Sequence, residues 1–141
     1  MGQFLKTTIV RGDEGAIVRH DIDDAEAFST TEKCPTISVD VHDGSILTFT
    51  LYLDGKQVDS YNSCPGYFDD SDTTPSGGDA AVLATEFNRK EYETRIEDIL
   101  RFDSINGDDE DRYVFATERL SDLIEALGGD PNKLEVEENA G

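Results

Sequence analysis

Two Asp-Gly dipeptides, at residues 43–44 and 54–55, constrain the fold of this chain more than any other feature. Apolar and polar side chains alternate before the first dipeptide and again between the two, which is the period of a half-buried β-strand. An Asp-Gly pair between such runs is a strong local sign of a hairpin, because a type I′ turn needs a positive φ angle at both central residues. Residues 36–62 therefore predict a three-stranded antiparallel meander.

The residues before the meander indicate a second hairpin and a short helix. Residues 3–10 are rich in β-branched side chains and predict a strand, with residues 16–20 as its partner across a glycine-containing turn. Residues 21–33 carry acidic and polar side chains and predict a short helix. Asp23 or Asp24 is its expected N-cap, because a carboxylate there accepts from the free amides of the first turn.

The residues after position 79 indicate three amphipathic helices. Asp79 is placed to cap the first of them, over residues 80–87, whose apolar side chains share one face. The apolar positions of the second helix are Tyr92, Ile96, Ile99 and Leu100, and those of the third are Ala116, Leu120, Leu123, Ile124 and Leu127. Gly128-Gly129 follows as the expected left-handed cap of the third helix.

The order of these patterns predicts an α+β fold. We expect an antiparallel β-meander of about four to five strands, followed by two or three C-terminal helices packed on one face of the sheet. Residues 1–132 form a single acidic α+β domain in this interpretation, and residues 133–141 form an acidic flexible tail.

The charge of the chain excludes some partners and favours others. The 32 acidic and 12 basic residues give a net charge of −20 over 141 residues. Direct contact with nucleic acid needs clustered Lys and Arg, so it is not expected. The sequence contains no apolar run near the ~20 residues of a membrane helix and no signal peptide, so we expect a cytoplasmic protein without membrane contact.

The familiar catalytic motifs do not occur in the sequence. A nucleophile-elbow Gly-x-Ser-x-Gly, a phosphate-binding loop and a dinucleotide fingerprint are all missing, so an enzyme is not favoured and no cofactor is expected. Cys64 is a poor nucleophile candidate, because surrounding carboxylates disfavour its thiolate. Cys34 and Cys64 are expected to stay reduced.

Metal binding is a secondary possibility at two kinds of site. His20, Cys34, His42 and Cys64 have the chemistry of zinc ligands but lack the tight spacing that zinc motifs share, and both histidines are expected to face solvent. Calcium prefers carboxylate oxygens, although no EF-hand pattern is present. The weak calcium candidates are Asp69, Asp70, Asp72, Asp103, Asn106 and Asp108.

An aromatic and acidic stretch lies in the long loop predicted at residues 62–79. Loops of this length in compact domains tend to be functional or disordered. The aromatic rings at its start either fold back on the core or form a binding surface for a cationic partner. In the second interpretation the partner-binding residues are Tyr61, Tyr67, Phe68, Asp69, Asp70, Asp72, Asp108, Asp109 and Asp111.

These features favour a non-enzymatic acidic module that binds a basic protein, in the manner of an inhibitor or immunity-type protein. Opposite charges accelerate such an encounter. Two alternatives stay open: a housekeeping domain of a halophilic microbe, whose acidic surface is a salt adaptation, and a calcium-binding protein. The first hypothesis requires the carboxylates to gather in one patch beside the aromatic residues, whereas salt adaptation requires an even coat.

Overall fold

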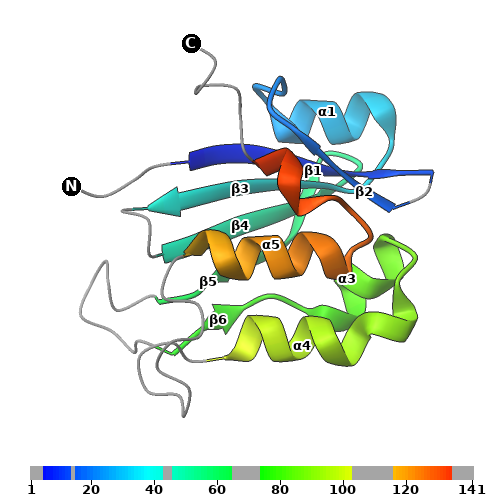
Figure 1. The fold of residues 1–141 in the computed structure, drawn as a ribbon. Helices are drawn as coiled ribbons and strands as arrows, with labels where there is room; N and C mark the ends of the chain where they lie inside the picture. Colours follow the sequence, from blue (N-terminus) through cyan, green and yellow to red (C-terminus); the bar gives the residue numbers. More distant parts are fainter. Residues whose placement is uncertain (1–4, 14, 43–45, 65–73, 103–115, 135–141) are drawn as a thin grey trace.

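The computed structural model describes residues 5–13, 15–42, 46–64, 74–102 and 116–134, which form an antiparallel sheet with helices on it (Figure 1). The six strands follow the spatial order β2-β1-β3-β4-β5-β6. The strands are β1 (Leu5–Gly12), β2 (Gly15–Arg19), β3 (Thr36–His42), β4 (Ile46–Leu53), β5 (Lys56–Asn62) and β6 (Ser76–Gly77). The helices are α1 (Ala25–Glu32), α3 (Ala80–Glu86), η1 (Lys90–Tyr92), α4 (Glu93–Arg101), α5 (Ala116–Ala126) and η2 (Pro131–Leu134).

The predicted α+β fold with an antiparallel meander is confirmed. Strands β3, β4 and β5 pair consecutively, and the hairpin of β1 and β2 extends the sheet beside β3. At the turn between β4 and β5, Asp54 and Gly55 have φ angles of 53° and 81°, both positive as a type I′ turn requires. The other dipeptide, at residues 43–44, lies outside the described residues. The short strand β6 was not predicted, and it makes the sheet one strand wider than expected.

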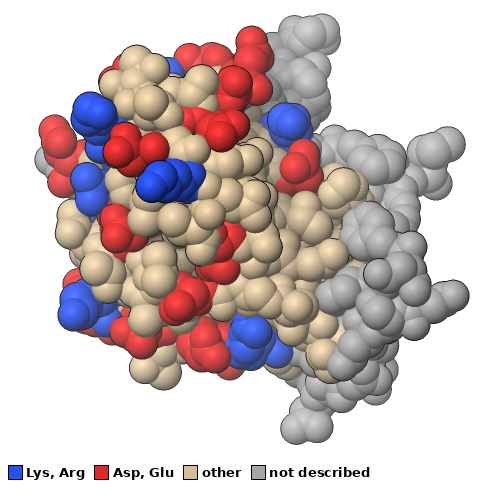
Figure 2. All heavy atoms as spheres, turned by 180° about the vertical axis from the view of Figure 1, so that it is seen from behind, with Lys and Arg blue, Asp and Glu red and all other residues tan. Residues whose placement is uncertain are grey.

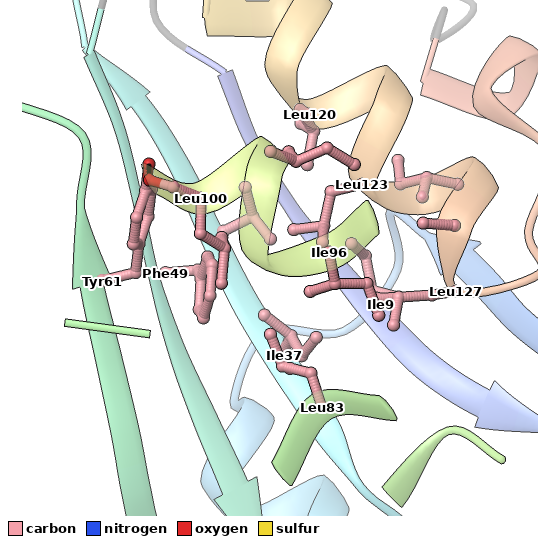
Figure 3. Packing of buried hydrophobic residues seen from close by; sticks show 14 of the residues in the cluster. Ile9, Ile37, Phe49, Tyr61, Leu83, Ile96, Leu100, Leu120, Leu123 and Leu127 are labelled. Carbon is pink, nitrogen blue, oxygen red and sulfur yellow. Dashed lines mark hydrogen bonds between the residues drawn. The ribbon is translucent and has the colours of Figure 1, made fainter. Parts of the chain in front are cut away.

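The core lies between one face of the sheet and the C-terminal helices (Figure 3). Ile37, Val39 and Val41 alternate along β3 toward this face and are at most 1 % exposed. Helices α4 and α5 cover these side chains, so the predicted packing of C-terminal helices on one face is confirmed (Figure 1). Helix α1 packs on the opposite face of the sheet. Val18 of β2 points toward the core, so the next residue, Arg19, points to the other face. There its guanidinium lies 5.7 Å from the centre of the Phe28 ring of α1.

The helix ends follow the capping residues that the sequence predicts. The Asp24 carboxylate accepts from the Ala27 amide at 3.0 Å, so Asp24 rather than Asp23 caps α1. The Asp79 carboxylate accepts from the Ala81 and Val82 amides and caps α3. Helix α5 ends in a Schellman motif, because Gly128 has a φ angle of 91° and the Gly129 amide donates to the Ile124 carbonyl at 2.8 Å.

Two details differ from the predicted elements. The sequence predicts Tyr92 on the apolar face of the second helix, but α4 begins at Glu93 and Tyr92 is 41 % exposed. The Arg89 guanidinium lies 5.9 Å from the centre of this ring instead. Residues 133 and 134, assigned to the tail, belong to η2, and Leu134 is buried against the core. Residues 135–141 lie outside the described part of the chain.

Candidate functional site

The structure describes a single member of the predicted partner-binding set, Tyr61. The other members, Tyr67, Phe68, Asp69, Asp70, Asp72, Asp108, Asp109 and Asp111, lie outside the described residues, as do the calcium candidates Asp103 and Asn106. The predicted association of these side chains in one patch therefore stays a prediction.

Tyr61 is a core residue, which corrects its assignment to a partner-binding surface. Its side chain is 3 % exposed, and its ring stacks on Phe49 with the ring centres 5.1 Å apart (Figure 3). The Tyr61 hydroxyl donates to the Leu100 carbonyl at 2.8 Å. Register explains the burial, because Tyr61 pairs with Phe49 across β4 and β5 and so shares its inward face.

Tyr61 and a buried arginine satisfy carbonyl groups at the end of α4. Arg119 of α5 is 2 % exposed, and its guanidinium donates to the Ile99 carbonyl at 2.6 Å. The last carbonyls of a helix have no partner within the helix, and a cation is favourable near them. Sequence reasoning did not single out Arg119, since a charged residue in an amphipathic helix is usually assigned to the solvent side.

A second set of contacts holds the chain where β6 leads into α3. The Asp59 carboxylate accepts from the amides of Ser60, Gly78 and Asp79 at 2.9, 3.3 and 2.6 Å. The Arg101 guanidinium donates to the carbonyls of Gly77 and Gly78. A Cβ atom on Gly77 would collide with the Ser60 carbonyl, so glycine is needed there. These contacts fix the start of α3 beside the end of α4.

Between the start of α3 and the first half of α4 lies a hollow that we call the acidic hollow, a cavity of about 400 Å³. The described residues that line it are Gly78, Asp79, Ala80, Ala81, Glu93, Thr94 and Glu97. Three of them, Asp79, Glu93 and Glu97, are exposed carboxylates, and none is a lysine or arginine. Arg101 provides a counter-charge at its edge, with its Nε atom 4.0 Å from the Glu97 carboxylate. Carboxylates around a concave surface focus negative potential into it.

The sequence did not point to the acidic hollow. Its carboxylates come from the N-cap of α3 and from α4, and in the sequence each reads as an ordinary capping, first-turn or solvent-facing acid. Only the packing of α3 against α4 brings them around one cavity.

Charges are mixed over the described surface. On the face seen in Figure 2, acidic and basic side chains are interspersed around uncharged ones. Eleven of the 12 basic residues lie in the described part, whereas a large share of the 32 acidic residues does not. The acidic residues outside it are Glu14, Asp43, Asp69, Asp70, Asp72, Asp103, Asp108, Asp109, Glu110, Asp111, Glu135, Glu137 and Glu138. Most of the excess charge thus belongs to the undescribed segments.

The histidines and cysteines are not brought together. No group of three or more His, Cys, Asp or Glu side chains among the described residues could hold a metal ion, so the zinc set considered above is not assembled. Neither cysteine is in a disulfide; Cys64 is buried and Cys34 is half-buried. His42 is half-buried, with its Nε2 atom 3.4 Å from the Thr48 hydroxyl, and His20 is exposed but hydrogen-bonded.

An ion pair beside His20 is the clearest electrostatic feature of the described surface. The Arg19 guanidinium donates to both carboxylate oxygens of Asp21 at 2.8 Å. These hydrogen bonds lower the pKa of Asp21 and raise the pKa of Arg19. Both side chains are partly in solvent, so the pair fixes local geometry more than it stabilises the fold.

In the residues that the structure describes, none of the helices has the length and apolar character needed to cross a membrane. No family model, no curated protein and no solved structure was found to match the chain.

Proposed function

We propose that this protein is a non-enzymatic binding module whose acidic surface captures a basic protein partner. The observation that carries the proposal is the acidic hollow, where Asp79, Glu93 and Glu97 line a cavity of about 400 Å³ and no lysine or arginine is among the described residues that line it. An arginine of a partner could enter this cavity and donate several charge-assisted hydrogen bonds, because its planar guanidinium matches carboxylate geometry.

The net charge of −20 supports the same function at longer range. A strongly acidic protein attracts a basic one before contact and accelerates the encounter, and this attraction weakens with added salt. Inhibitors and immunity-type proteins that block a basic, nucleic-acid-binding target use such a field. We therefore place this protein in that class, with the cytoplasm as its compartment.

The proposal can be tested with a synthetic arginine-rich peptide as the probe. Its dissociation constant is measured by fluorescence anisotropy for the wild type and for a double variant, Glu93→Gln with Glu97→Gln. We expect the double variant to bind about tenfold more weakly, because two hydrogen-bonded charges are lost from the hollow.

A matched control variant has the same net charge as this double variant but keeps the carboxylates of the acidic hollow. Asp23→Asn with Glu26→Gln neutralises two exposed acids at the start of α1, on the opposite face of the sheet. This control should weaken binding only through the long-range field, by about twofold. Equal loss in both double variants would rule out the hollow as the contact, and no binding by the wild type would rule out the proposed function.

A further inference from the structure

The ring of His20 connects the sheet to the C-terminal helix η2. His20 follows directly after β2, and its Nδ1 atom lies 3.0 Å from the Thr7 hydroxyl of β1. Its Nε2 atom lies 2.8 Å from the carbonyl oxygen of Lys133 in η2, a residue 113 positions away in the sequence. The Thr7 hydroxyl also lies 3.0 Å from the Arg19 carbonyl. We call this set of three contacts the His20 bridge.

Counting protons shows which form of the ring fits the His20 bridge. The carbonyl oxygens of Lys133 and Arg19 can only accept, so Nε2 must carry a proton and the Thr7 hydroxyl must donate its single proton to Arg19. The Thr7 oxygen is then free to accept from Nδ1, which must carry a proton as well. All three hydrogen bonds form together only when both ring nitrogens are protonated, that is, in the imidazolium ion.

Either neutral form of the ring loses one of these contacts. With the proton on Nε2, Nδ1 competes with the Arg19 carbonyl for the Thr7 proton; with the proton on Nδ1, the contact to Lys133 has no donor. Water cannot readily replace the lost partner at Thr7, because that side chain is 2 % exposed. At the other end of the bridge, buried Leu134 anchors η2 and keeps the Lys133 carbonyl near the ring.

Charged groups of both signs lie on the elements that meet at the ring. These are Lys6 of β1, Arg19 and Asp21 at the end of β2, and Asp130 and Lys133 beside or within η2. Asp21 interacts electrostatically with His20 and is held ionised by Arg19, so its charge is constant where histidine ordinarily titrates, between pH 5 and 8.

We propose that the His20 bridge is a pH-sensitive device that holds η2 against the β1–β2 hairpin when His20 is protonated and loosens it when the proton leaves to solvent. The bridge is therefore complete at low pH, and the docking of η2 weakens as the pH rises. This inference is independent of the proposed function, because none of its residues lines the acidic hollow.

Hydrogen exchange at the Lys133 amide tests this directly, since that amide donates to the Asp130 carbonyl within η2. Its protection factor, corrected for intrinsic exchange, should be about fivefold higher at pH 5.5 than at pH 7.5, as expected for one hydrogen bond of ordinary strength. The Leu127 amide, bonded to Leu123 at the end of α5, reports any change in global stability and serves as the internal reference.

Four variants distinguish the bridge from a general effect of pH. His20→Gln and Thr7→Val should each abolish the pH dependence at Lys133, and Thr7→Ser should retain it. His42→Gln, which removes the chain's other histidine, should leave it unchanged. The same pH ratio in the wild type and in His20→Gln would overturn the proposal, as would higher protection at pH 7.5.

Discussion

At the scale of single residues, Tyr61 shows how one hydroxyl joins two layers of the molecule. Its ring packs against Phe49 of the sheet, and its hydroxyl reaches the Leu100 carbonyl at the end of α4. The Arg119 guanidinium donates a hydrogen bond to the neighbouring Ile99 carbonyl in the same way. Polar atoms of two buried side chains thus complete a helix end that would otherwise lack partners in the core.

Removing the Tyr61 hydroxyl should destabilise the protein measurably. We expect Tyr61→Phe to lower the free energy of unfolding by about 1–2 kcal/mol, because the Leu100 carbonyl then loses a partner in a buried setting. Urea denaturation measures the change. Tyr92→Phe is the matched control, and at 41 % exposure it should shift stability by less than about 0.5 kcal/mol. A Tyr61 variant as stable as this control would mean that the hydrogen bond contributes nothing.

At the scale of elements, helix caps and turns follow from short stretches of sequence. Asp24 precedes α1 and Asp79 precedes α3, each with its carboxylate on first-turn amides, and Gly128 ends α5 in the left-handed conformation. In each case the partners are only a few residues apart, so the local sequence specifies the geometry. Strand β6 is the exception, because its pairing with β5 depends on residues outside its own segment.

Neighbouring aspartates before α1 allow the cap to be tested with a close control. Asp24→Ala should cost about 1 kcal/mol of stability, because the Ala27 amide loses its acceptor. Asp23→Ala changes the same charge one residue earlier and should have little effect. Urea denaturation of both variants at equal ionic strength gives the comparison. Equal losses would show that charge, rather than the capping hydrogen bond, determines the result.

At the scale of the whole molecule, the dominant quantity is the net charge of −20. Like charges on a small body repel each other and oppose compaction, and salt screens them as the Debye length falls from about 10 Å at 0.1 M to 3 Å at 1 M. Much of this charge belongs to residues that the structure does not describe. The salt response of stability is therefore a property of the entire chain.

The melting temperature should rise with KCl concentration. We expect an increase of roughly 3–10 °C between 0.05 and 1 M KCl as repulsion is screened, measured by circular dichroism. The double variant Asp23→Asn with Glu26→Gln should melt higher at low salt and respond less. A flat response to KCl would contradict self-repulsion and disfavour salt adaptation. An additional rise with CaCl₂ at matched ionic strength would instead support a calcium site in residues 65–73 or 103–115.

The sequence alone determined those parts of the protein whose physics is local. The alternation in β3 and β4, the Asp54-Gly55 turn and the cap at Asp79 each depend on residues a few positions apart, and each was predicted. These patterns were enough to establish the α+β fold, because alternating runs joined by tight turns have few ways to pair other than as a meander.

Tertiary structure decided which side chains are buried and which ones meet. Register across β4 and β5 turned Tyr61 inward onto Phe49, and the packing of α3 against α4 gathered Asp79 and the α4 carboxylates around one hollow. The contact of His20 with Lys133 joins residues far apart in the chain. No local pattern encodes such contacts, since they depend on how whole elements pack and not on the preferences of neighbouring residues.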